Sequence, residues 1–225
     1  MVKLQFLTIM QEDEFRELKK DFPHDKEFLH SIGSIRYCKA EVFRDCILGT
    51  LRIPGKNEKR TPQIVFGFYL TDKELFLIGC SGDLKHWVEK KEDQFQELKS
   101  PDQCLLQIME LMIENDILYL LHLEKEIEKM EDQLIKGVPD DFFTVLTRYR
   151  QKLSELNAYY EQLTVIGDLL QSQDGLSIIH NAEQWNRYAL RTERLQNHVH
   201  LLRENILQLR ELYQSQQDAQ QNKIM

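Results

Sequence analysis

The sequence predicts an α+β protein, in which a small mixed or antiparallel β-sheet flanked by helices is followed by a long helical hairpin and a long C-terminal stalk helix. Three observations predict this class. Stretches dense in β-branched and aromatic residues end at Gly79. Two stretches with helical spacing follow, joined by a short connection that contains Gly137 and Pro139. Residues 177–225 contain neither Gly nor Pro, which favours one unbroken helix.

The first part of the chain, residues 1–100, is expected to form an α/β domain. Residues 3–9 predict a short strand, and residues 12–20 predict a short helix that Pro23 separates from the next element. A second short helix is predicted at residues 24–30, with its end at Gly33 because glycine commonly ends helices.

Four further strands are predicted where β-branched and aromatic side chains are densest, at residues 35–43, 46–53, 63–70 and 74–79. The connections at residues 44–45 and 71–73 are short enough for hairpins. We therefore expect an antiparallel meander, which needs helices over one face. An amphipathic helix over residues 83–98 is expected to help cover it.

The second part, residues 101–175, is expected to be the helical hairpin. Ser100, Pro101 and Gln103 have the arrangement of a helix start, with Ser at the N-cap, Pro in the first turn and Gln in the capping-box position. The helix that they begin is predicted to continue to Ile135. A second long helix is predicted from residue 141 to about residue 170, before a turn at Asp174 and Gly175.

The third part, residues 176–225, is expected to be the stalk helix. From Trp185 its apolar residues recur at alternating steps of three and four, with Thr192 as the one polar member: Trp185, Tyr188, Thr192, Leu195, Val199, Leu202, Ile206, Leu209 and Tyr213. Such a helix would be roughly 70 Å long, so we expect most of this stripe to need partner helices. The same register then reaches Gln216 and Gln220, so the stripe becomes polar near its end.

Composition excludes several classes of protein. The net charge of −8 and the pI near 5.4 argue against a nucleic-acid partner. The four cysteines, at positions 38, 46, 80 and 104, form no CxxC pair, so we predict buried or free thiols in a reducing compartment. The N-terminus lacks the features of a signal peptide, and no run of about 18 apolar residues occurs. We therefore expect this fragment itself to be soluble.

Motifs of common enzymes are missing from the sequence. There is no Gly-rich phosphate loop, nucleophile elbow, HExxH motif or Cys/His cluster, so we expect neither an enzyme nor a tightly bound cofactor. The small residues at 79–82 are more simply a turn than an anion site. His198 and His200 project from different sides of a helix and cannot share one ion within a chain, so we expect solvated or interfacial histidines.

An acidic run in the first hairpin helix supplies weak candidates for binding divalent cations: Glu124, Glu128, Glu131 and Asp132. Lys125 and Lys129 are interleaved with them. This spacing favours a solvated face with ion pairs between neighbouring turns over a metal site.

The end of the chain, ELYQSQQDAQQNKIM, resembles the end of the cytosolic stalk in the CorA-type magnesium/cobalt transporter family. In that family a Tyr shortly after an acidic residue precedes a polar stretch and an Asn-x-x-Met motif, which fall here on Glu211, Tyr213, Asn222 and Met225. The segments KAEVFRDCILGTLRIP and QIVFGFYLTDKELFLIG are similar to the paired strands of the family's cytosolic domain. The order of elements agrees with the family from about residue 24 to the end.

The resemblance implies a subunit of a homopentameric divalent-cation channel, with Mg2+ as the transported and regulatory ion and Co2+ or Ni2+ as further candidates. It implies a location on the cytoplasmic face of the cell (inner) membrane, reached through segments beyond Met225. It also implies roles for three residues. Met225 would belong to a hydrophobic gate, Asn222 to a polar ring beside it, and Glu211 to an acidic ring near the cytosolic entrance.

Two positions depart from the family's pattern. His30 and Arg187 stand where the resemblance implies acidic ligands of a regulatory metal site between subunits, and neither is a carboxylate. We therefore expect little magnesium sensing at these positions, and a monomer or weak oligomer for the isolated domain. The alternative function is a soluble scaffold whose coiled coil serves only oligomerisation. In a scaffold the apolar stripe should continue to the end of the helix, or the helix should end in a capping residue.

Overall fold

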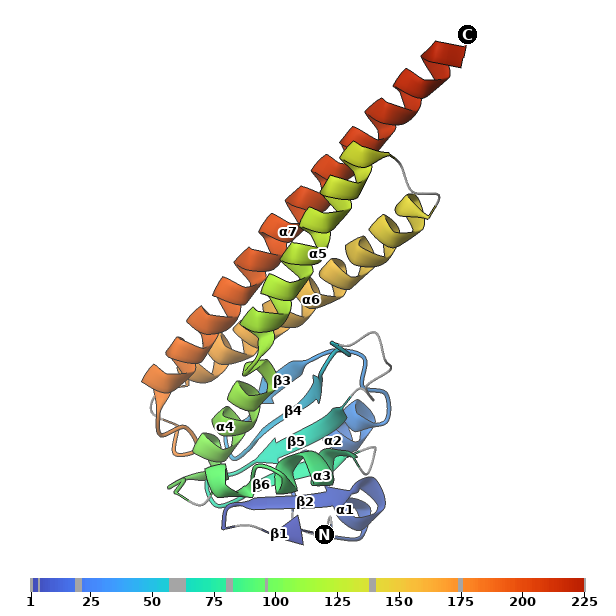
Figure 1. Ribbon diagram of the computed structural model, residues 1–225. Helices are drawn as coiled ribbons and strands as arrows, with labels where there is room; N and C mark the ends of the chain where they lie inside the picture. Colours follow the sequence, from blue (N-terminus) through green and yellow to red (C-terminus); the bar gives the residue numbers. More distant parts are fainter. Residues whose placement is uncertain are drawn as a thin grey trace. The chain divides into compact units, whose positions relative to one another are not determined.

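The computed structural model describes residues 2–3, 5–18, 22–56, 64–79, 83–95, 97–137, 141–173 and 176–224 (Figure 1). The chain divides into two compact units. The first unit comprises Met1–Glu114 and Glu161–Thr192, and the second comprises Asn115–Tyr160 and Glu193–Met225. The two longest helices each contribute to both units, so this division does not follow the residue boundaries expected at 100 and 175.

The first unit contains a six-stranded sheet with the strand order β1-β2-β6-β5-β4-β3. Its strands are β1 (Val2–Lys3), β2 (Leu7–Gln11), β3 (Lys39–Val42), β4 (Ile47–Arg52), β5 (Val65–Leu70) and β6 (Leu75–Gly79). The last four form the predicted antiparallel meander. Strand β2 adds to β6 in parallel, which makes the sheet mixed. The predicted strand at residues 3–9 is instead two strands, β1 and β2, which pair antiparallel.

Both predicted hairpins are present. The Phe43 N–H donates to the Cys46 carbonyl at 2.8 Å, and the Thr71 N–H donates to the Glu74 carbonyl at 2.9 Å. The Thr71 hydroxyl also accepts bonds from the Lys73 and Glu74 N–H groups, at 3.2 and 3.0 Å. These short polar turns fix the register of the meander, and thereby decide which side chains point to each face.

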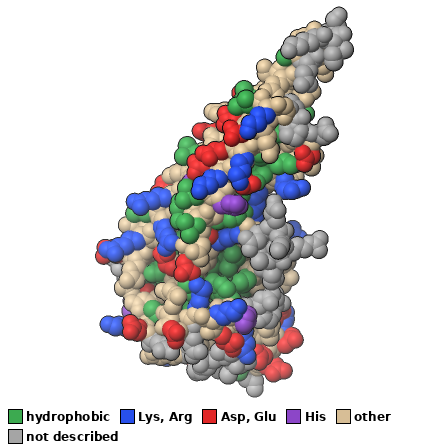
Figure 2. Space-filling model, viewed as in Figure 1, with side chains coloured by type: hydrophobic (Ala, Val, Ile, Leu, Met, Phe, Trp, Pro, Cys, Tyr) green, Lys and Arg blue, Asp and Glu red, His purple; other side chains and the backbone are tan. Residues whose placement is uncertain are grey.

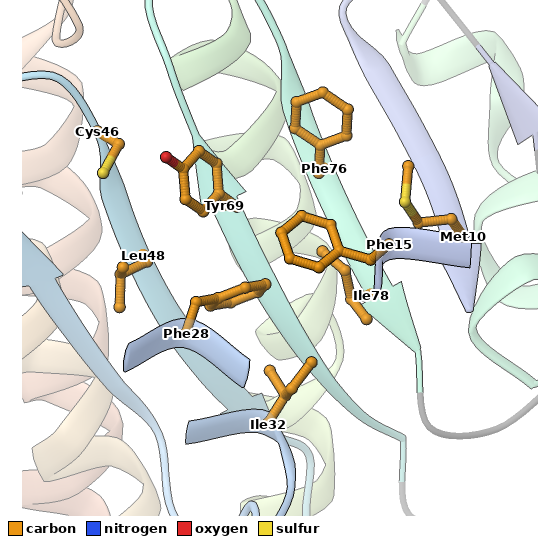
Figure 3. Packing of buried hydrophobic residues seen from close by; sticks show 9 residues of the cluster. All are labelled: Met10, Phe15, Phe28, Ile32, Cys46, Leu48, Tyr69, Phe76 and Ile78. Carbon is orange, nitrogen blue, oxygen red and sulfur yellow. The ribbon is translucent and has the colours of Figure 1, made fainter. Parts of the chain in front are cut away.

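One face of the sheet is covered by the two predicted short helices, α1 (Glu12–Leu18) and α2 (Asp25–Ile32). Their aromatic side chains meet the sheet in the cluster that Figure 3 shows, where Phe28 lies 5.2 Å from Phe15 and 5.6 Å from Tyr69, measured between ring centroids. A side chain at Gly67 would collide with Ile32. Helix α2 can therefore lie directly on β5 only because residue 67 is glycine.

The opposite face of the sheet is covered as well, by helix α4 (Pro101–Ile113), which contacts β5 and β6. Side chains alternate along a strand, so Phe68 and Leu70 are buried on this face while Tyr69 is buried on the other. The meander thus has helices on both faces rather than on one, and its strands are accordingly buried almost throughout.

Two predicted helices are interrupted. Residues 83–98 form α3 (Asp83–Glu89) and a short 3-10 helix, η2 (Glu92–Phe95). The helix expected from Ser100 to Ile135 is divided into α4 and α5 (Asp116–Lys136) by a turn at residues 114–115. The backbone of Asn115 leaves the helical conformation there, with φ −107° and ψ 12°, and asparagine favours such turns because its amide competes for backbone hydrogen bonds.

The second unit is built from α5 and from parts of α6 (Phe142–Gln171) and α7 (Ala182–Ile224), which contain 21, 30 and 43 residues. The apolar stripe of the stalk, here called the seam, is present as predicted. The stripe was expected to need partner helices, and it is covered by helices of the same chain. Eight of its nine residues, Trp185 to Leu209, are buried within the single chain. In the second unit, α5 and α6 also bury apolar side chains, among them Leu123, Ile127, Leu146 and Leu153.

Candidate functional site

The C-terminal part of α7 carries Glu211 and Asn222, two of the three residues for which the resemblance implies a role in ion passage. The seam ends there with two contacts to the hairpin. The Tyr213 ring stacks on Phe142, with centroids 5.3 Å apart and planes at 18°. The Gln216 amide then donates to the Leu134 carbonyl at 3.1 Å, close to the end of α5. The seam becomes polar at Gln216, as its sequence predicted, and the structure places this change close to the end of α5.

Glu211 and Asn222 are exposed and lie on the side of α7 that faces away from the seam. They are 11 residues apart, which places them on one face about three turns, or about 16 Å, from each other. They are therefore aligned along the helix without contact between them. Met225, the third residue implied by the resemblance, lies outside the described residues.

The same face carries two further carboxylates that the sequence analysis missed. Glu204, Glu211 and Asp218 follow one another at intervals of seven residues and are all exposed, so they form a column with a spacing of about 10 Å. We call these three residues the acidic column. No Lys or Arg stands three or four residues from any of them, and none takes part in the ion pairs that the described residues form. Counting the heptad period of charged residues, and not only of apolar ones, would have found the column.

The acidic run on α5 is arranged differently. Glu124 lies 3.5 Å from the Nε2 atom of His198, while Glu128, Glu131 and Asp132 are exposed. Lys129 donates to Glu126 at 2.7 Å, and this hydrogen bond lowers the pKa of Glu126. Acidic and basic side chains are interspersed over the helices on the face drawn in Figure 2. Within the described part of the chain, no three His, Cys, Asp or Glu side chains come together as a metal site requires.

The two histidines of the stalk are separate, as expected. His198 is mostly buried beside Glu124, whereas His200 is exposed. The two positions that depart from the family's pattern belong to the first unit. His30 is exposed on α2, and Arg187 is exposed on α7, where it forms an ion pair of 2.5 Å with Glu183.

The cysteines behave as the sequence predicted wherever the structure describes them. Cys38, Cys46 and Cys104 are free and buried. Burial raises the pKa of the Cys38 thiol to about 11 and that of Cys104 to about 12. Such thiols stay protonated and unreactive near neutral pH. Cys80 and the small residues at 80–82 lie outside the described residues.

The fold and the long α7 helix have counterparts among known proteins. The family model described as "CorA-like Mg2+ transporter protein" matches residues 6–225, so this chain belongs to that family. No curated protein sequence matches the chain.

Several solved structures share the fold. The complete CorA magnesium transporter from Methanocaldococcus jannaschii is 18% identical, with a TM-score of 0.78 over 100% of this chain and 74% of its own. The full-length CmaX protein is 13% identical, with a TM-score of 0.79 over 97% of this chain and 70% of its own. The cytoplasmic domain of ZntB from Vibrio parahaemolyticus is 14% identical, with a TM-score of 0.74 over 95% and 88% of the two chains. Among the described residues, no helix has both the length and the apolar character needed to cross a bilayer.

Proposed function

We propose that this chain is the cytosolic domain of a divalent-cation channel, and that α7 leads toward a pore formed by membrane segments beyond Met225. Mg2+ is the first candidate for the transported ion, with Co2+ and Ni2+ as further candidates. In this proposal the chain has no enzymatic activity. Family membership supports the class of protein, and the acidic column on α7 is the observation that supports the path of the ion.

The acidic column suits a hydrated divalent cation. Mg2+ loses its water reluctantly, so a conducting surface must attract the hydrated ion without holding it tightly. Exposed carboxylates about 10 Å apart do this, because each is too far from the next for both to ligate one ion. Asn222 continues the same face with an amide, which can hydrogen-bond the water shell of the ion.

Assembly multiplies this effect. In the proposed homopentamer, five copies of the face opposite the seam surround one axis, so that each carboxylate becomes a ring of five. Glu211 then forms the acidic ring, Asn222 the polar ring and Met225 part of an apolar gate that closes by excluding water. The seam is buried in the chain's own core, which leaves the opposite face of α7 open for such an assembly.

Ion flux measured with the full-length gene product in liposomes tests the proposal. The variant Glu204→Gln/Glu211→Gln/Asp218→Asn is expected to take up Mg2+ at least about threefold more slowly at low ionic strength, and the difference should shrink in high salt, because screening weakens steering. The matched control is Glu128→Gln/Glu131→Gln/Asp132→Asn on α5, which removes the same charge and should keep the wild-type rate.

The same experiment separates the channel from the alternative scaffold. A scaffold predicts no protein-dependent flux of Mg2+, Co2+ or Ni2+ in any variant. Equal slowing by the α7 and α5 variants would show that total charge matters and that the column has no special place in the path.

A further inference from the structure

A hollow between α6 and α7 in the second unit has a chemistry that the proposed function does not use. It has a volume of about 510 Å³ and adjoins a smaller hollow of about 60 Å³. Arg150, Ile206 and Leu207 line both, so the two form one groove. The larger part alone falls within the range of about 300–1,000 Å³ that is usual for small-molecule sites.

Three arginines converge on this groove. Arg150 comes from α6, and Arg203 and Arg210 come from α7, two turns apart. None of them takes part in an ion pair or hydrogen bond that the described residues form. Two other arginines of α7 do form ion pairs, Arg187 with Glu183 and Arg191 with Glu110. A positively charged groove without carboxylates is therefore a local exception on a chain whose net charge is −8.

The floor and rim of the groove are apolar. Leu153 and Ile206 are buried beneath it, and Phe143 and Leu207 border it with exposed fractions of 54% and 52%. Gln151, Ser154 and Thr147 add uncharged hydrogen-bonding groups on the α6 side. The groove thus offers a cationic wall and an apolar surface to the same occupant.

We propose that this groove binds an organic phosphate, with the phosphate group held by the arginines and an apolar part lying on the floor. A guanidinium group presents paired N–H donors that match two phosphate oxygens, and it is less strongly hydrated than an ammonium group. A bare inorganic anion would leave Leu207 and Phe143 uncovered, whereas an apolar substituent removes their surface from water.

Two kinds of ligand share this chemistry, and binding experiments distinguish them. The probes are dihexanoyl phosphatidic acid as a dispersed lipid, AMP as a soluble nucleotide, and inorganic pyrophosphate as an anion without an apolar part, each titrated calorimetrically into the 225-residue chain. We expect saturable binding of the lipid or of AMP with a Kd below about 1 mM, and at least about tenfold weaker binding of pyrophosphate. Binding of the lipid alone indicates a membrane source, and binding of AMP alone indicates a soluble metabolite.

Variants locate the binding. Arg150→Gln and Arg203→Gln are each expected to weaken the affinity for the organic phosphate about tenfold. Leu207→Asn is expected to weaken the binding of the organic phosphate and to leave the binding of pyrophosphate unchanged. Arg148→Gln and Arg194→Gln, exposed arginines on the same helices outside the groove, are the matched controls and should change the affinity less than about twofold. Thermal unfolding verifies that each variant folds.

Three results overturn the proposal. The first is that neither the lipid nor AMP binds, and the second is that the control variants weaken the affinity as much as Arg150→Gln and Arg203→Gln do. The third is that pyrophosphate binds as tightly as the lipid and AMP. Sedimentation velocity adds a fourth. If the chain dimerises and Arg150→Gln abolishes the dimer, a second copy occupies the groove and the phosphate assignment is wrong. None of these results depends on ion flux, so the outcome is independent of the channel proposal.

Discussion

The phenol of Tyr160 on α6 donates a 2.9 Å hydrogen bond to the carboxylate of Asp116 on α5, and both side chains are fully buried. Asp116 is the first residue of α5, directly after the turn that separates α5 from α4. A buried carboxylate is stable only with donors around it. The Tyr160 contact therefore explains how an ionisable residue is accommodated where the predicted continuous helix breaks.

Replacing Tyr160 by Phe should lower the free energy of unfolding by about 1–3 kcal/mol, because a buried carboxylate loses one donor. Urea denaturation followed by circular dichroism measures this. Asp116→Asn keeps an acceptor for the phenol and removes the buried charge, so it should destabilise less than Tyr160→Phe. A Tyr160→Phe variant as stable as the wild-type chain would mean that the hydrogen bond contributes nothing net.

Helices α6 and α7 approach closely at Gly167, where an added Cβ would lie 2.9 Å from the Cβ of Ala189. Gly167→Val should therefore destabilise the chain by about 1–3 kcal/mol through overpacking. The double variant Gly167→Ala/Ala189→Gly provides the control, since it moves the methyl group from one helix to the other. If the contact is the cause, the double variant should be more stable than Gly167→Ala alone, and additive effects would contradict this explanation.

Mg2+ at millimolar concentration should shift the melting temperature of this chain little through His30 or Arg187. An imidazole and a guanidinium group are poor ligands for a hard cation, and Arg187 is already paired with Glu183. Differential scanning fluorimetry with and without Mg2+ measures the shift. A large stabilisation that disappears in His30→Ala or Arg187→Ala would prove this prediction wrong.

Alkaline pH should destabilise the fold through its buried thiols. The pKa of Cys104 is raised from 9.0 to about 12 and that of Cys38 to about 11, in both cases chiefly by burial. Above pH 9 the unfolded chain releases protons that the folded chain retains, so stability falls as pH rises toward these folded values. Each thiol contributes a slope of at most about 1.4 kcal/mol per pH unit.

The slope of stability against pH between 9 and 11 checks this, with Cys104→Ala as the comparison. The variant should be less stable overall but show a shallower slope, because one buried thiol no longer titrates. Iodoacetamide labelling read by peptide mapping should find Cys38 and Cys104 protected in the folded chain at pH 9. An identical slope in the variant would remove Cys104 from the explanation.

Local patterns predicted most of the fold. The strands of the meander, both hairpin turns, and helices α1, α2 and α6 follow from short-range signals such as β-branched density, turn residues and helical spacing. The parallel pairing of β2 with β6 does not, because it joins residues such as Ile9 and Leu77 that no local pattern relates. The break at residue 115 was missed for a similar reason, since the partner of Asp116 lies 44 residues away.

The candidate site was predicted only in part. The resemblance implied roles for Glu211 and Asn222, and the structure places both on one exposed face. The resemblance did not imply Glu204 or Asp218. Their spacing of seven residues from Glu211 places them on the same face and could have been read from the sequence. The groove arginines could not be found from the sequence. Arg150 and Arg203 are separated by more than fifty residues, and only the packing of α6 against α7 makes them line one hollow.

The burial of the seam has a consequence for the assembly that we propose. Trp185 to Leu209 are buried without a second copy, so in that proposal folding of a subunit would not depend on its association with others. Chains carrying different substitutions could then be mixed after they have folded. A proposed assembly with one altered carboxylate among several normal ones would be accessible by such mixing.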